Sequence, residues 1–191
     1  MHLAIRWLGL VMLSVMAAVL TGCAGPAPNY APSIDNVEML RKTGATPTKT
    51  GTVAVAPGLK TANAIHLRAN TMVSGVGSHF GDYIAAALQQ ELELAKLYNL
   101  QSEFEISGTL LQNDINAGGF NTNDGFIEVR FVVRRGTTVR FDKSKKVAHQ
   151  WVSSFAGAVA IPLAANNYPI MVQKLIGALI ADPDFIASLR P

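Results

Sequence analysis

The chain has 191 residues, with 16 Lys and Arg against 13 Asp and Glu, and a formal charge of +3 at pH 7. This balance is too even to predict binding to nucleic acid, which is typical of domains with a strongly basic face. A chain of this length can bury a sizeable core in one domain. Because there is one cysteine, no disulfide within the chain supports that core.

The first 22 residues have the pattern of a secretory signal peptide. A short basic start, with His2 and Arg6, precedes an apolar stretch from Trp7 to Leu20. This stretch is too short to span a bilayer comfortably, since a spanning helix needs about 20 apolar residues. A charged start, a short apolar core and small residues before a cleavage point are typical of exported proteins, whose signal is removed.

The apolar stretch ends in Leu20-Thr21-Gly22-Cys23, which contains the only cysteine. This run resembles the signals of bacterial lipoproteins. The resemblance implies cleavage before Cys23, diacylglycerol on its thiol and an acyl chain on its new amine; three chains hold a protein far more firmly than one. Because Ala24 and not Asp follows, it also implies the inner leaflet of the outer membrane, with the protein facing the periplasm. The alternative is an ordinary signal peptide with an incidental cysteine.

We predict three parts: a lipoprotein signal peptide at 1–22, a flexible tether at 23–51 and a single α+β domain at 52–191. Residues 24–32 contain three prolines and no charge, and residues 43–51 are rich in Thr, Lys and Gly, so neither predicts regular structure. Residues 34–40 between them can form one helical turn. As a coil, this tether would span on the order of 30 Å.

Alternation of apolar and polar residues predicts the strands of the domain. They are expected at 52–56, 65–70, 104–115 and 127–135 and, after a turn at Gly136, at 139–141 and 147–151. Residues 142–146 are expected to form a bulge or a second turn.

Apolar residues spaced by three and four predict two helices. The first covers 79–98 with Ser78 as its N-cap, and the second covers 167–181, capped by Asn166 or Asn167. Asp182 then precedes a last turn at 185–189. This order predicts an α+β fold in which two helices pack on one face of an antiparallel sheet of about four strands.

Seven basic residues fall within 17 positions, opposed in that window by Asp142 alone. They are Arg130, Arg134, Arg135, Arg140, Lys143, Lys145 and Lys146. One hypothesis is a solvated sheet edge that lysines protect against pairing. The other is a contact for anionic lipid headgroups, phosphates or an acidic partner. We expect Arg135, Lys143 and Lys145 to be exposed.

We expect no cofactor, no metal and no enzyme activity. Residues 75–81 are glycine-rich and precede a predicted helix, but they match neither common phosphate-binding motif. His66, His79 and His149 are not spaced as metal ligands, and we expect His149 to pack beside Trp151. No serine lies in a nucleophile elbow.

The order of elements across residues 52–181 resembles the auxiliary lipoproteins of ABC-type lipid transport systems. The resemblance implies a docking or accessory subunit in envelope assembly or lipid transport. Its partners would be the membrane, through Cys23, and an envelope protein or anionic lipid. The alternative is a small binding protein that holds a lipid or glycan fragment between sheet and helices. A closed apolar cavity would favour this alternative, and a filled core with an exposed apolar patch would favour the accessory subunit.

Overall fold

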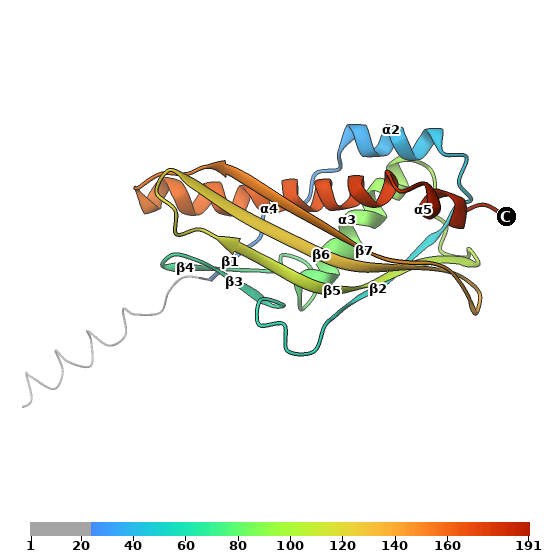
Figure 1. The fold of residues 1–191 in the computed structure, drawn as a ribbon, viewed down its shortest axis with the longest axis horizontal. Coiled ribbons are helices and arrows are strands. Elements are labelled where there is room, and N and C mark those ends of the chain that lie inside the picture. The colour runs from blue at the N-terminus through green and yellow to red at the C-terminus, as the bar shows by residue number, and fades with distance from the viewer. Residues whose placement is uncertain (1–23) are drawn as a thin grey trace, which may run out of the picture.

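A four-stranded sheet in the order β2-β5-β6-β7 forms the centre of the computed structural model, which describes residues 24–191 (Figure 1). Its strands are β2 (Lys49–Val55), β5 (Phe104–Asn116), β6 (Thr122–Arg135) and β7 (Thr138–Val152). The last three form an antiparallel meander, while β2 runs parallel to β5. The predicted α+β class and largely antiparallel sheet are therefore confirmed, with one parallel pair at the edge.

Two helices cover the same face of this sheet. Helix α3 (Phe80–Leu94) packs on β2 and β5, and α4 (Gly157–Ile180) packs on β6 and β7. Every second residue of β6 from Ile127 to Val133 is buried beneath them, as half-buried alternation predicts. These residues share one core with the α3 stripe that contains Ile84, Leu88 and Leu92. The predicted register of β6 is therefore correct.

A second, smaller sheet was not expected. It contains β1 (Ala24–Pro26), β3 (Ala64–Leu67) and β4 (Asn70–Val73) in the order β1-β4-β3. The single strand predicted at 65–70 is instead a hairpin, because Arg68 adopts a left-handed φ of 58° and turns the chain. β1 runs parallel to β4, with Ala24 paired to Thr71.

The predicted flexible tether is wrong for residues 24–51, which are folded against the domain. After β1, helix α2 (Ile34–Lys42) begins at its N-cap Ser33 and packs on α3 and α4, with Val37 and Leu40 buried. The Tyr83 hydroxyl also donates to the Pro28 carbonyl at 2.7 Å. Residues 1–22 and Cys23 lie outside the described residues.

A fully buried carboxyl group on α3 holds this N-terminal segment. Glu91 Oε1 accepts hydrogen bonds from the Tyr30 hydroxyl, from the Ser33 backbone N–H at 3.2 Å and from Asn36 Nδ2 at 3.1 Å. Burial raises the pKa of Glu91, and the three donors oppose that shift. The proline-rich segment is thus ordered by a partner about 60 positions away in the sequence.

Several predicted boundaries also differ from the structure. His79, not Ser78, caps α3, and Asp82 completes the capping box. β7 continues through 142–146, because the single extra residue of the bulge is near Arg140, where the register with β6 shifts. α4 begins at Gly157, ten residues before the expected cap, with Pro162 and Pro169 inside the helix. Helix α5 (Pro183–Ser188) begins at its N-cap Asp182.

Candidate functional site

The predicted basic cluster lies along β6, β7 and the turn that joins them. Gly136 makes this turn with a left-handed φ of 56°, as expected. β6 has 14 residues, so the turn lies roughly 45 Å from the other end of the strand. The β6–β7 turn is consequently at the opposite end of the domain from the start of α4 (Figure 1).

The structure does not bring the seven basic residues together on one surface. On the sheet face away from the helices, Arg130 binds Asp142 through two hydrogen bonds of 2.6 and 2.5 Å, which lower the pKa of that carboxyl. On the same face, Lys146 Nζ lies 3.7 Å from a Glu128 carboxylate oxygen. These cations are neutralised by acids on neighbouring strands and help to hold the open face of the sheet.

Lys143 and Lys145 point toward the helices and bind the start of α5. Lys143 Nζ lies 2.6 Å from Asp184 Oδ2 and 3.3 Å from Asp182 Oδ2, and Lys145 Nζ lies 2.6 Å from Asp182 Oδ2. The hydrogen bond from Lys145 lowers the pKa of Asp182 to about 2. The Lys145 side chain is only 18 % exposed, so the expectation that it is exposed is wrong. These lysines fasten α5 to β7.

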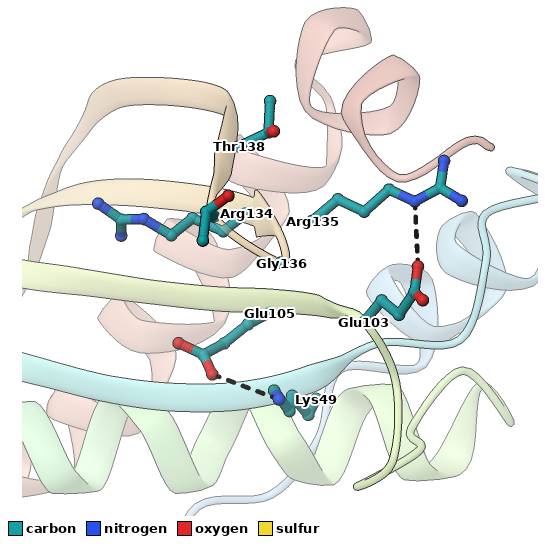
Figure 2. Close-up of a pocket in the computed structure, with 8 residues that line it drawn as sticks. Lys49, Glu103, Glu105, Arg134, Arg135, Gly136 and Thr138 are labelled. Atoms are coloured by element: carbon teal, nitrogen blue, oxygen red, sulfur yellow. Dashed lines mark hydrogen bonds and ion pairs between the residues drawn. The ribbon is translucent and has the colours of Figure 1, made fainter.

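A pocket of about 520 Å³ opens beside the β6–β7 turn and contains charges of both signs. Figure 2 shows Arg135 reaching Glu103, at 3.3 Å, and Lys49 reaching Glu105, at 3.8 Å. The Arg134 guanidinium extends away from both pairs (Figure 2). Within residues 24–191, Arg134 has no carboxylate oxygen within 4.0 Å.

Arg140 completes the basic end of the hairpin. Its guanidinium carbon lies 5.7 Å from the centre of the Phe104 ring, and that of Arg135 lies 5.3 Å from the same ring. Like Arg134, Arg140 has no carboxylate partner within 4.0 Å in the described part of the chain. Of the seven predicted residues, Arg134 and Arg140 are thus the ones with charge available to a partner.

In the glycine-rich stretch before α3, the free backbone N–H groups are already bound by a side chain of the protein itself. Asp82 Oδ2 accepts from the backbone N–H groups of Ser78, at 2.7 Å, and His79, at 3.3 Å. A carboxylate therefore occupies the position where a phosphate would bind at a helix N-terminus. This geometry gives no support to a phosphate site there.

His149 packs as predicted. Its ring centre lies 5.6 Å from that of Trp151, and its Nε2 lies 3.0 Å from Asn167 Oδ1. Among residues 24–191, no group of three or more His, Cys, Asp or Glu side chains is placed to hold a metal ion. In the same part of the chain, no helix is both long and apolar enough to cross a membrane.

An exposed aromatic pair at the far end of the domain was missed from the sequence. Phe120, in the β5–β6 turn, and Phe155, between β7 and α4, lie edge to face with ring centres 5.2 Å apart. The signal that could have found it is the absence of Asp, Glu, Lys and Arg from residues 117–123 and 147–173, which contain the two rings. Alternation and helical periodicity describe only buried faces and do not detect such a pair.

Neither the models of known protein families nor the curated proteins match this sequence. Among solved structures, protein XCC0632 from Xanthomonas campestris, described with the family model DUF330, is similar with a TM-score of 0.52. The two chains are 12 % identical, over 83 % of this chain and 95 % of that protein. The hypothetical protein CT253 from Chlamydia trachomatis gives a TM-score of 0.48 at 11 % identity, over 75 % of this chain and 98 % of its own. The likeness to XCC0632 shows that the two proteins share a fold.

Proposed function

We propose that this protein is a lipid-anchored lipoprotein of the outer membrane that acts as a non-enzymatic docking or accessory subunit in the periplasm. The observation that carries the proposal is the lipoprotein-like run Leu20-Thr21-Gly22-Cys23, followed at once by a folded residue. Ala24 already belongs to β1 and pairs with Thr71. An acylated Cys23 would therefore be joined directly to the domain.

In this proposal, the direct connection would hold the end with Ala24 at the membrane. A coil of residues 23–51 would let the domain turn freely, whereas these residues from Ala24 onward pack in β1, α2 and β2. With the end that contains Ala24 held at the bilayer, the β6–β7 turn would lie at the far end of β6, a strand roughly 45 Å long. That distance exceeds the reach of electrostatic attraction at physiological salt, about 8 Å. We therefore propose that the basic end contacts an acidic group of another envelope protein, not the headgroups of the anchoring membrane.

The alternative function, a carrier that holds a lipid or glycan between sheet and helices, has less support. That space is filled by side chains: Phe80, Tyr83 and Tyr168 are buried, and the Tyr168 ring centre lies 4.8 Å from Phe80 and 5.4 Å from Tyr83. A filled core together with an exposed aromatic pair favours the accessory subunit. The most buried carboxyl, Glu91, binds the protein's own N-terminal segment and faces no pocket described above, which supports a non-enzymatic role.

The anchor is tested by acyl labelling in cells that express the full chain. The wild type is expected to incorporate labelled fatty acid, and Cys23→Ser is expected to incorporate none and to remain as precursor or soluble protein. Unchanged labelling of the variant contradicts the anchor. Fractionation tests the effect of Ala24 separately, since recovery with the inner membrane would remove the outer-membrane assignment and leave lipidation intact.

Docking is tested in intact envelopes with a photocrosslinker at the exposed Thr137 in the β6–β7 turn, which leaves Arg134 in place. We expect it to capture a defined protein in a salt-sensitive manner, and a crosslinker at the exposed Gln150, toward the other end of β7, to capture none. With the crosslinker at Thr137, Arg134→Glu should abolish the product, whereas Lys42→Glu on exposed α2 should leave it unchanged. Equal capture at both positions contradicts docking at the hairpin end.

A further inference from the structure

The end of the domain where β1 begins also contains two loops of the large sheet. Ala24 pairs with Thr71 at the start of β4, three residues after the Arg68 turn. Arg68 in turn binds the β5–β6 turn and the segment between β7 and α4. β1, these loops and the first turns of α4 therefore lie at one end of the molecule (Figure 1).

Large apolar side chains project from these loops into solvent. Phe155 is 78 % exposed, Val152 77 %, Phe120 62 % and Val159 50 %. The two phenylalanine rings touch edge to face, and the Ser153 N–H donates to the Asn121 carbonyl at 2.7 Å, which joins their loops. We call Phe120, Val152, Phe155 and Val159 the apolar tip. Exposed apolar groups that are held together in this way are typical of a contact surface.

Apart from Arg68 in the β3–β4 turn, the segments that form this end contain no charged residue. Residues 24–26, 117–123 and 152–163 contain no Asp, Glu, Lys or Arg, although the whole chain contains 29 such residues. The first turns of α4 also expose Pro162 and Leu163. Because charged side chains are costly to transfer into a bilayer, their absence suits a surface that meets lipid.

Arg68 satisfies the backbone of the loops that carry the apolar tip. Its guanidinium donates to the carbonyl oxygens of Ala117, Gly119 and Ser154, each at 2.8 Å, and of Phe155 at 3.1 Å. Loop carbonyls bonded only to water would be left without hydrogen-bond partners where lipid excludes water, which destabilises the inserted state. Arg68 supplies these partners from within the protein, and the carbonyl oxygens in turn solvate its guanidinium group.

We propose that the apolar tip inserts into the same lipid leaflet that holds Cys23, as a second membrane contact. The proposal rests on the lipid anchor proposed above, because Ala24, where the chain leaves the described domain, is at this end. Insertion is interfacial, since apolar faces that contain Phe and Leu bury only about 5–10 Å into the boundary between headgroups and acyl chains. Together, the anchor and the tip fix the orientation of the domain, with the β6–β7 turn pointing into the periplasm.

The full chain, purified from envelopes, is reconstituted in vesicles of phosphatidylethanolamine and phosphatidylglycerol. A Val152→Cys variant provides one thiol for an environment-sensitive bimane probe, because an acylated Cys23 has none. Val139→Cys, exposed beside the β6–β7 turn, is the control. Lipids with brominated acyl chains should reduce emission several-fold at position 152 and leave it unchanged at position 139. Equal responses at the two positions overturn the proposal.

Double substitution of Phe120→Ser and Phe155→Ser should restore emission at position 152. The matched change, Ile34→Ser with Leu100→Ser, alters two other exposed apolar residues and should leave quenching intact. If position 152 becomes shielded only when envelope proteins are added, the tip is covered by a protein and not by lipid. That result overturns the proposal. The mass of Cys23 in the same sample separates the two claims. An acylated protein that is not quenched refutes the tip alone, whereas an unmodified cysteine refutes the anchor and with it the tip.

Discussion

Glu91 offers the sharpest test of how the N-terminal segment is held. Glu91→Ala removes the acceptor shared by Tyr30, Ser33 and Asn36. Asn36 Nδ2 would keep its hydrogen bond to the Gln173 carbonyl, at 2.9 Å. The Tyr30 hydroxyl and the Ser33 N–H would lose the Glu91 acceptor. Each buried group left unpaired costs about 1–3 kcal/mol, so the loss of these two partners should lower the unfolding free energy by about 2–6 kcal/mol.

Glu91→Gln separates hydrogen bonding from charge. The amide oxygen can accept the same three bonds, and the amide nitrogen replaces Oε2, which has no partner in the described structure. Because burial raises the pKa of Glu91 above its ordinary value of 4.5, the folded state holds the proton more tightly than the unfolded state. Wild-type stability should then fall as the pH rises from 4.5 toward the raised pKa. Because Gln does not titrate, the stability of the Gln variant lacks this dependence on pH. Its stability should therefore rise relative to that of the wild type as the pH rises.

Urea denaturation of the mature chain between pH 4.5 and about 8 measures both effects. Glu38→Ala is the control, because its carboxylate is exposed on α2 and should contribute little. If Glu91→Gln is destabilised as much as Glu91→Ala throughout this range, the buried group acts as a required charge and the reasoning is wrong.

Three further predictions test the sheet, the lysine contacts and the apolar tip. Phe131→Ala should cost about 3–5 kcal/mol and Arg134→Ala well under 1 in urea melts, and equal costs would mean that the β6 register is wrong. Lys145→Ala should destabilise the protein at neutral pH, and its difference from the wild type should shrink as Asp182 is protonated between pH 3.8 and about 2. Arg68→Ala should speed amide hydrogen exchange in residues 117–121 and 153–156 and leave β6 protected, whereas uniform exchange across the domain would contradict its role as a loop fastener.

Patterns that repeat within a short window predicted much of the fold. The strict alternation of β6 and the three- and four-residue spacing of α3 each report one buried face, and both faces meet in the core. The turn at Gly136 was also predictable, because a left-handed φ favours glycine. The β3–β4 turn was not, because Arg68, a residue that seldom adopts a left-handed φ, occupies it.

Interactions between distant positions could not be predicted. Nothing near Pro26 or Tyr30 reveals that Glu91 orders the segment, so composition predicted a tether. The basic cluster was misleading for the same reason. Within its window of 17 residues, Asp142 is the only acidic residue that opposes the basic cluster. The fold nevertheless brings Asp182 to Lys145 from 37 residues away. Charge available to a partner could be identified only after these pairs were known.

Intact mass spectrometry of the mature protein from envelopes reads both the first residue of the mature chain and the lipid attached to it. We expect a chain that begins at Cys23, with diacylglycerol on its thiol and an acyl chain on its amine. Such a chain would join the lipid to β1 without a spacer. A mature chain that begins at another residue, or that carries an unmodified Cys23, would contradict the proposed lipid anchor.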